Sequence, residues 1–354
     1  MNKRVLFKIF VFLYLFIFSI ELIKKLTLIL SKDLINWFSF IDTSLKSFSF
    51  GWLFTSIVQS GGGIIIILAT FTGLGVINFI TGFYSMLGTR IGITITPLLM
   101  SLFFKNTKRR DFRHGFEISL AHIFYNLSLV LLFVFLEYFF NIFSKIGFVV
   151  GDKMSDSFLV TSFPNLINLF FDWLVNIFLL LEYKFLLLVF ALILLLVSLE
   201  FISKYLLKLF DGEQRTRKII NSCFRSKSVC FFTGLISTFL LTSTNITITL
   251  LVPLAVKRVI NLKKAIPFII GANVGTVLEV VILTLIAGKS LAIALVFVYI
   301  LFALIGVLMW LPNTNLLFKI TKYFSKKMMH VSRKRALVYF VIFILIPLFI
   351  LIFS

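Results

Sequence analysis

Charged residues are scarce in this sequence, and so are cysteine and histidine. Only 14% of the 354 residues are charged, and 14 residues are Asp or Glu. Ordinary globular domains are about a quarter charged, so this chain has too few charges to cover a water-soluble body. The scarcity excludes a cytosolic enzyme, a secreted disulfide scaffold and a disordered protein.

The residues of catalysis and metal binding are also few. The two cysteines, Cys223 and Cys230, match no metal or redox motif, and the three histidines are scattered. The sequence contains no nucleophile elbow and no P-loop. We therefore expect no catalytic residue, no enzymatic activity, no cofactor and no structural metal ion.

Apolar residues dominate instead. They make up 60% of the chain, and the mean hydropathy is +1.08. A membrane-spanning helix needs about 20 apolar residues, and the chain has several such stretches. We therefore expect a multi-pass, all-α integral protein of the cell membrane, from a bacterium with an AT-rich genome. The apolar segments are 5–22, 48–75, 82–104, 117–140, 158–181, 183–203, 228–256, 265–287, 290–311 and 336–353.

The net charge of +21 is concentrated in short connections. Of 35 Lys and Arg residues, 23 lie in four segments between apolar stretches. Basic loops remain in the cytoplasm, which is the interpretation we prefer to binding of anionic lipid or nucleic acid. We expect the lipid bilayer as a partner and no nucleic acid. The four segments are 105–113, 204–227, 257–264 and 319–335.

Two apolar segments carry polar residues in their middle. Segment 48–75 is interrupted by Gln59-Ser60-Gly61-Gly62-Gly63, and segment 228–256 by Thr242-Ser243-Thr244-Asn245. Irregular backbone at membrane depth is tolerated where it is buried in protein or lines a cavity. We therefore expect two re-entrant helical hairpins whose tips meet inside the protein.

The two interrupted segments are copies of one unit. At a shift of 183 residues, ten of the 42 positions in 51–92 are identical, among them glycine, threonine, serine and asparagine positions. Each unit is expected to be a broken hairpin, a turn and then a helix that starts with a GxxxG pair. The pairs are Gly88/Gly92 and Gly271/Gly275. Close helix packing is the default interpretation of such pairs.

Charge orients the two units in opposite directions. The basic loop 105–113 is expected in the cytoplasm, which places both ends of the first hairpin outside. The basic segments 204–227 and 257–264 flank the second hairpin and place its ends inside. The sequence thus predicts an inverted-topology repeat, which is the architecture of many secondary transporters.

The chain then divides into five parts. The number of spans in the third part stays open. The parts are an N-terminal transmembrane helix with an outer linker (1–47), repeat unit one (48–140), an outer region with connecting transmembrane segments (141–203), a basic cytoplasmic loop with repeat unit two (204–311), and a basic loop with a C-terminal transmembrane helix (312–354).

The hairpin tips are candidate binding sites. Glycines allow close approach of a ligand, and a half-helix that begins in the interior offers free N–H groups. Such a tip suits a small anion, or a sodium ion held by carbonyl and hydroxyl oxygens; helix packing is the alternative. Arg90 and Glu279 lie within otherwise apolar segments. They are expected to form a salt bridge with each other, to serve the site, or both.

These motifs resemble the sodium-dependent phosphate cotransporters of type II and their bacterial relatives. That family carries two QSSS hairpins, each followed by a GANIGTT-like helix. Here the copies read GWLFTSIVQSGGG and GLISTFLLTSTNITIT, followed by MLGTRIGITIT and IIGANVGT. The stretch 109–137 is similar to the family's segment after the first repeat. The resemblance implies an inverted-repeat bundle that holds phosphate and sodium between its hairpin tips.

Several motif positions depart from the family. The serines after Ser60 are replaced by glycines, the second-copy glutamine by Thr242, and the first-copy asparagine by Arg90. We expect a sodium-coupled phosphate symporter. The rivals are a sodium-independent anion carrier, in which Arg90 replaces a cation, and a non-transporting scaffold or receptor. The candidate phosphate- and ion-binding residues are Gln59, Ser60, Gly61, Arg90, Thr94, Thr242, Ser243, Thr244, Asn245, Asn273, Thr276 and Glu279.

Overall fold

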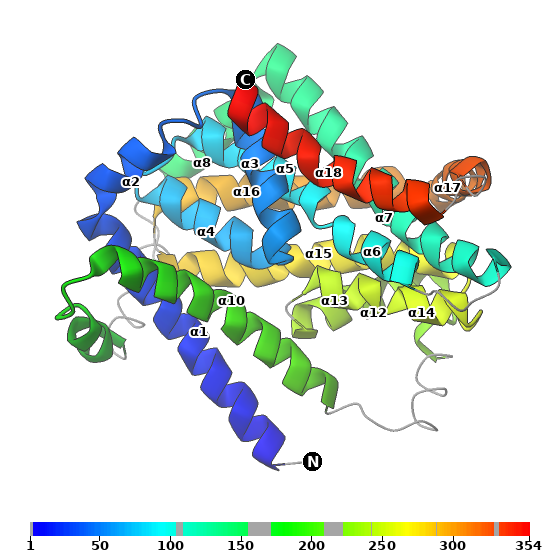
Figure 1. The fold of residues 1–354 in the computed structure, drawn as a ribbon, viewed down its shortest axis with the longest axis horizontal. Helices are drawn as coiled ribbons and strands as arrows, with labels where there is room; N and C mark the ends of the chain where they lie inside the picture. The colour runs from blue at the N-terminus through cyan, green and yellow to red at the C-terminus, as the bar shows by residue number, and fades with distance from the viewer. Residues whose placement is uncertain are drawn as a thin grey trace.

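The structure is a computed structural model that describes residues 3–103, 109–154, 171–208, 222–241, 243–287, 289–328 and 333–354. Within these ranges every regular element is a helix, as the sequence predicts (Figure 1). The helices are α1 (Lys3–Ile29), α2 (Ser31–Phe38), α3 (Ser44–Val58), α4 (Gly61–Gly73), α5 (Phe79–Gly92), α6 (Ile95–Phe103), α7 (Arg109–Phe140), α8 (Ile142–Met154), α10 (Lys184–Lys208), α12 (Lys227–Leu241), α13 (Thr244–Thr249), α14 (Leu251–Val256), α15 (Leu262–Ala287), α16 (Ser290–Trp310), α17 (Thr314–Met328) and α18 (Arg333–Phe353).

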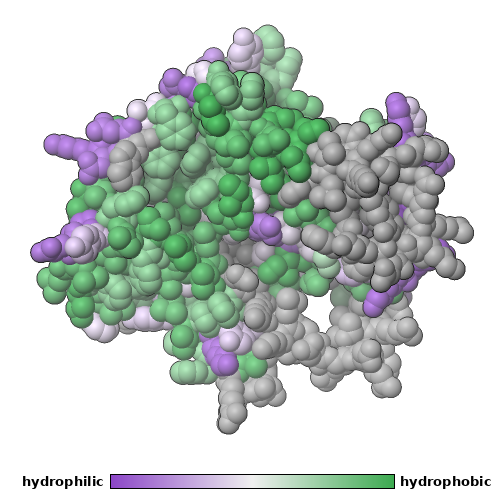
Figure 2. All heavy atoms as spheres, in the orientation of Figure 1, coloured by the Kyte–Doolittle hydropathy of each residue, from purple (hydrophilic) through white to green (hydrophobic). Residues whose placement is uncertain are grey.

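Many apolar side chains lie on the outside of the bundle. Leu131 and Phe135 on α7 and Leu308 on α16 are exposed, as are Leu345 and Phe349 on α18. Figure 2 shows apolar residues over most of the described surface on this face, with hydrophilic residues mainly toward its margins. Among the described residues, 113–140 and 290–310 are long and apolar enough to cross a membrane. An apolar exterior of this kind suits lipid rather than water.

Two helix pairs hold the interrupted segments. Helix α3 packs on α5, and α12 packs on α15. A Cβ on Gly88 would clash with the carbonyl of Phe48, and one on Gly271 would clash with that of Phe231. The second contact is the first one shifted by 183 residues. These glycines therefore allow close helix approach, which is the default interpretation of the GxxxG pairs.

The chain breaks its helices at both polar interruptions. Helix α3 ends at Val58, and Gln59 has a left-handed φ of 59°. The Ser60 hydroxyl accepts a hydrogen bond from the Gly63 N–H (3.3 Å) and thereby caps α4. In the second copy, the Ser243 hydroxyl accepts from the Ile246 N–H (3.3 Å) and caps α13. The predicted residue Thr242 lies outside the described residues.

The turns that follow are also alike. Gly75 (φ 74°) and Arg258 (φ 58°) are left-handed and are equivalent at the 183-residue shift. Asn78 Oδ1 accepts from the Thr81 N–H (2.8 Å) at the start of α5, and Asn261 Oδ1 accepts from the Lys264 N–H (3.0 Å) at the start of α15. The same residue types therefore specify the same capped turn twice.

The helices after the two turns differ. The sequence predicts one helical segment over 82–104, but α5 ends at Gly92 and α6 begins at Ile95. Pro97 explains the break, because a proline ring clashes with the carbonyl four residues earlier. Position 280, its equivalent, is Val280, and α15 continues through it. The expectation that the GxxxG pair starts its helix was wrong: Gly88 and Gly92 lie at the end of α5.

The remaining helices enclose these pairs. Helix α1 packs along α10, and the rings of Phe12 and Phe201 stack with centroids 4.7 Å apart (Figure 1). Residues 171–178, the described helical part of segment 158–181, lie against α1, where Lys25 forms an ion pair with Asp172 (2.8 Å). Helix α18 lies over α3 and α6. At the tips of the two interrupted segments, Gln59 is exposed, Ser60 and Ser243 are half-buried, and Asn245 is buried.

Candidate functional site

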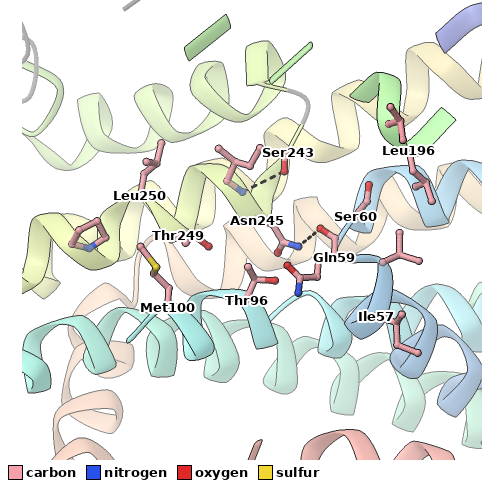
Figure 3. Close-up of a pocket in the computed structure, with 14 residues that line it drawn as sticks. Ile57, Gln59, Ser60, Thr96, Met100, Leu196, Ser243, Asn245, Thr249 and Leu250 are labelled. Carbon is pink, nitrogen blue, oxygen red and sulfur yellow. Dashed lines mark hydrogen bonds between the residues drawn. The ribbon is translucent and has the colours of Figure 1, made fainter. Parts of the chain in front are cut away.

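A pocket lies where the two helix breaks meet (Figure 3). Its volume is about 450 Å³. The residues that line it come from the end of α3, from the connection between α3 and α4, and from helices α6, α10, α13 and α14. They are Ile57, Val58, Gln59, Ser60, Thr96, Met100, Leu196, Val197, Ser243, Asn245, Ile246, Thr249, Leu250 and Pro253.

One hydrogen bond joins the two tips directly. The Asn245 side-chain amide donates to the carbonyl oxygen of Gln59, across 186 residues of sequence (Figure 3). The left-handed conformation of Gln59 turns the chain between α3 and α4 at this point. The predicted tip residues Gln59, Ser60, Ser243 and Asn245 thus gather around one cavity.

The pocket is polar without being charged. No charged side chain is found among the described residues that line it. Asn245 Oδ1 and the hydroxyls of Thr96 and Thr249 are buried and lack a hydrogen-bond partner among the described groups. Buried polar atoms normally have partners, so these three oxygens are available to a ligand. Together they offer acceptors for a cation and hydroxyl donors for an anion.

The starts of α4 and α13 add donors to the same place. The first turn of a helix has backbone N–H groups without intrahelical partners and a partial positive charge. Ser60 and Ser243 each satisfy one of these groups and leave the others. Gly61, the first residue of α4, is buried, and a Cβ on it would meet the end of the flexible Ile93 side chain.

Two other predicted residues, Arg90 and Asn273, form a second group. The Arg90 side chain is only 1% exposed. Its Nε donates to Asn126 Oδ1 (3.2 Å), its Nη1 to the Tyr299 hydroxyl (2.7 Å), and its Nη2 to Asn273 Oδ1. The guanidinium also lies over the ring of Phe302, 5.5 Å from the centroid. Neutral groups therefore solvate this buried cation.

Arg90 and Asn273 lie 183 residues apart, which is the shift that aligns the two interrupted segments in the sequence. Their direct hydrogen bond places both at the centre of the bundle, where α5 and α15 meet α7 and α16. Glu279 lies on α15, but its side chain is outside those that the structure describes. The predicted salt bridge between Arg90 and Glu279 stays a prediction.

Three predicted threonines serve local contacts. The hydroxyls of Thr244 and Thr276 hydrogen-bond to each other and tie α13 to α15. The Thr94 hydroxyl donates to the Ile91 carbonyl (2.7 Å) at the break between α5 and α6. Thr94 is absent from the described lining of the pocket. The structure thus places some candidates at the pocket, Arg90 and Asn273 in a second group, and these threonines in neither.

Several residues of both groups were not predicted from sequence. Thr96, Met100 and Leu196 line the pocket, and Tyr299 binds Arg90. Each lies in an apolar helix, where a single residue gives no spacing signal. Only Pro97, next to Thr96, marks the break that brings α6 to the cavity.

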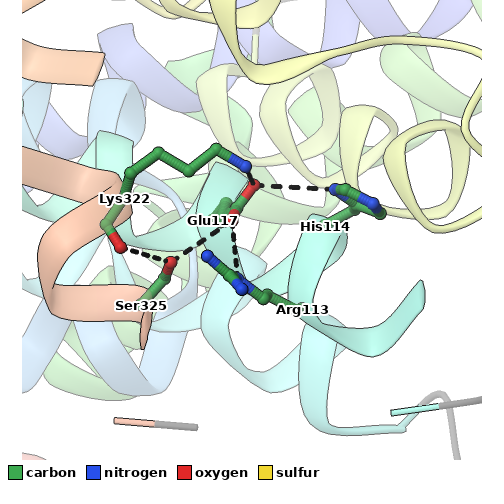
Figure 4. A network of polar contacts seen from close by, with 5 residues as sticks. All are labelled: Arg113, His114, Glu117, Lys322 and Ser325. Atoms are coloured by element: carbon green, nitrogen blue, oxygen red, sulfur yellow. Dashed lines mark hydrogen bonds and ion pairs between the residues drawn. The ribbon is translucent and has the colours of Figure 1, made fainter. Parts of the chain in front are cut away.

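A third polar cluster joins α7 to α17 (Figure 4). Glu117, 1% exposed, accepts from Lys322 (2.6 Å), Arg113 (3.0 Å) and the Ser325 hydroxyl (3.2 Å). His114 Nδ1 lies 3.6 Å from the same carboxylate. The cluster fixes the basic helix α17 against the start of α7. It lies outside the described lining of the pocket.

An all-helical bundle with an apolar exterior and a neutral polar cavity inside is organised like a membrane protein that binds a small solute. The model of the Na+/Pi-cotransporter family matches residues 15–151 and 194–332, which are more than half of the chain. The chain belongs to this family, which is a family of membrane transporters rather than of enzymes. No curated protein and no solved structure matches it.

Proposed function

We propose that the protein carries inorganic phosphate across the membrane together with sodium, by alternating access, and that the pocket between the helix tips is its binding site. The observation that carries this proposal is the meeting of Gln59 and Asn245 at a neutral polar cavity, in a chain of the Na+/Pi-cotransporter family. Membrane transporters commonly bind their solutes where interrupted helices meet.

The chemistry of the pocket supports an anion and a sodium ion together. The starts of α4 and α13, with Gln59 and the serine and threonine hydroxyls, supply donors for phosphate oxygens. The unpartnered oxygens of Thr96, Asn245 and Thr249 supply ligands for sodium. A site without charged side chains binds an anion more weakly than an arginine cluster and releases it more readily, as transport requires.

We also propose that the two units are inverted repeats and that each broken segment is a re-entrant hairpin. The shared caps, turns and glycine contacts at the 183-residue shift support the repeat. The hydrogen bond between Arg90 and its equivalent Asn273 is expected near a pseudo-two-fold axis, where equivalent residues meet. The basic residues around the second hairpin support its opposite orientation.

Arg90 bears on the number of sodium ions that accompany each phosphate. It is a permanent cation, it is buried, and its described partners are neutral. A fixed charge there takes over the electrostatic role of one coupling sodium. We therefore expect fewer sodium ions per phosphate than in relatives with asparagine at this position, and in the limit a sodium-independent carrier.

Uptake of radiolabelled phosphate into proteoliposomes tests the proposal, with and without an inward sodium gradient. Ser243→Ala and Asn245→Ala are expected to abolish uptake while the protein stays folded, because each buried polar contact contributes about 1–3 kcal/mol. Ser39→Ala, at the exposed end of α2, is the matched control. Unchanged kinetics in both pocket variants would place the site elsewhere. Absence of both flux and phosphate binding in the wild type would favour the non-transporting scaffold.

A further inference from the structure

A second, smaller pocket of the protein is strongly basic. Its volume is about 160 Å³. Four of the eight residues that line it are Lys or Arg, and none is acidic. They are Arg225, Ser226, Lys227, Cys230, Lys263, Lys264, Thr314 and Asn315. None of these residues lines the pocket between the helix tips.

Three helices begin at this basic pocket. Helix α12 starts at Lys227, where the Ser226 hydroxyl accepts from the Val229 N–H (3.3 Å). Helix α15 starts at Leu262 and contributes Lys263 and Lys264, and α17 starts at Thr314. Helix starts favour anions through their free N–H groups and their dipole. Three of them converge on one small space that already holds four cations.

An unpartnered hydroxyl marks the same pocket independently. Thr314 is 4% exposed, and its hydroxyl has no hydrogen-bond partner among the described groups. Buried hydroxyls are rarely left without a partner, because the loss costs free energy. The four cationic side chains are exposed and together give this small cavity a positive potential. The unpartnered hydroxyl and the positive potential both suit a small oxyanion.

We propose that this basic pocket binds a phosphate group. A tetrahedral oxyanion fits the volume, whereas a nucleotide is too large for it. Lys and Arg provide charge-assisted hydrogen bonds to phosphate oxygens, and Thr314 provides a neutral donor. The phosphate group is that of free inorganic phosphate or of an anionic lipid headgroup. On the orientation that we propose, this pocket faces the cytoplasm.

Helix contacts link the basic pocket to the centre of the bundle. Helix α17 begins at the pocket and is tied to α7 by the contacts of Lys322 and Ser325 with Glu117 (Figure 4). Helix α7 also carries Asn126, a partner of Arg90. A phosphate group bound at the start of α17 would therefore hold an element that packs on the centre of the bundle.

Calorimetric titration of the purified full chain with inorganic phosphate tests the site. The double variant Lys263→Gln/Lys264→Gln is expected to weaken binding by about tenfold or more, because it removes two charge-assisted contacts. Thr314→Val, which keeps the shape and the charge, is expected to weaken it several-fold. Lys319→Gln/Lys326→Gln removes the same charge from exposed positions of α17 and is expected to leave binding unchanged.

The titration is done in a Ser243→Ala/Asn245→Ala background, so that binding between the helix tips does not contribute. Failure of the transport proposal therefore leaves this test intact. Repeating it in nanodiscs with and without phosphatidic acid identifies the source of the phosphate group. If phosphatidic acid competes with inorganic phosphate in the Ser243→Ala/Asn245→Ala protein, and this competition is lost when Lys263→Gln/Lys264→Gln is added, the phosphate group is that of a lipid headgroup. If phosphatidic acid does not compete, the pocket binds free phosphate. Equal losses in the exposed-lysine control, or wild-type affinity in both pocket variants, would overturn the proposal.

Discussion

Replacement of Arg90 by methionine is the sharpest test of how the centre of the bundle is held. The change keeps most of the side-chain volume and removes every donor. Three hydrogen bonds are then lost, to Asn126 Oδ1, the Tyr299 hydroxyl and Asn273 Oδ1. At about 1–3 kcal/mol for each of the two buried amide oxygens that lose this donor, the loss is roughly 2–6 kcal/mol.

A second effect opposes this loss. Burying a cation costs several kcal/mol of desolvation, and Arg90→Met removes that cost. Because the remaining partners are neutral, no unpaired charge is left among them. We therefore expect a net destabilisation of about 1–3 kcal/mol, less than the sum of the separate losses. Arg90→Gln keeps an amide donor and is expected to lose about 1 kcal/mol or less.

Denaturant unfolding in detergent measures these changes, and uptake measures their functional counterpart. Arg90→Asn is expected to leave the fold intact and to make phosphate uptake more dependent on sodium. If Arg90 only neutralises Glu279, Arg90→Met would be strongly destabilising and Glu279→Gln would rescue it. That rescue would refute the neutral network. Wild-type uptake as steep in sodium as that of a multi-sodium carrier would refute the role of Arg90 as a substitute cation.

Three further predictions follow from the packing and the polar clusters. Gly88→Ala and Gly271→Ala are each expected to destabilise the protein by several kcal/mol, because the added methyl meets a backbone carbonyl rather than a movable side chain; wild-type melting temperatures would contradict this. Glu117→Gln is expected to cost about 1–3 kcal/mol, since its cationic partners are only partly exposed; a higher melting temperature would show that the buried carboxylate is itself unfavourable. The orientation of the two units is tested in a cysteine-free background with a membrane-impermeant thiol reagent. Lys46→Cys is expected to react from outside, and Lys257→Cys only from inside. Labelling of both cysteines from the same side would contradict the inverted orientation.

The sequence predicted the helix breaks because polar residues interrupt long apolar runs. Gln59, Ser60 and Ser243 lie where an apolar helix has no reason to place them, and the structure breaks both helices there. The sequence also predicted close helix contacts at the glycines, because the 183-residue shift aligns glycine with glycine at these positions. A position without a side chain in both copies indicates a backbone contact in both.

The environment of Arg90 could not be predicted in the same way. Asn126 and Tyr299 are separated from it by 36 and 209 residues. A single asparagine or tyrosine in an apolar helix marks no partner, so only the packing of α7 and α16 on α5 brings them together. The break before α6 was missed because Pro97 was counted as part of a continuous apolar segment.

The two interrupted segments have alike helix caps, turns and glycine contacts, but their residues at the pocket differ. Caps, turns and close glycine contacts agree at the 183-residue shift, whereas the first tip has glycines where the second has Thr244 and Asn245. A pair of identical tips would offer a symmetric site, in which a tetrahedral anion and a cation compete for equivalent groups. Here the first tip contributes Gln59 and the start of α4, and the second contributes the side-chain oxygens of Asn245 and Thr249. On the function that we propose, the two tips therefore offer the anion and the sodium ion non-equivalent groups. The difference between Arg90 and Asn273 adds to this asymmetry on the same proposal, because a single fixed cation beside the pocket would favour an anion over a cation there.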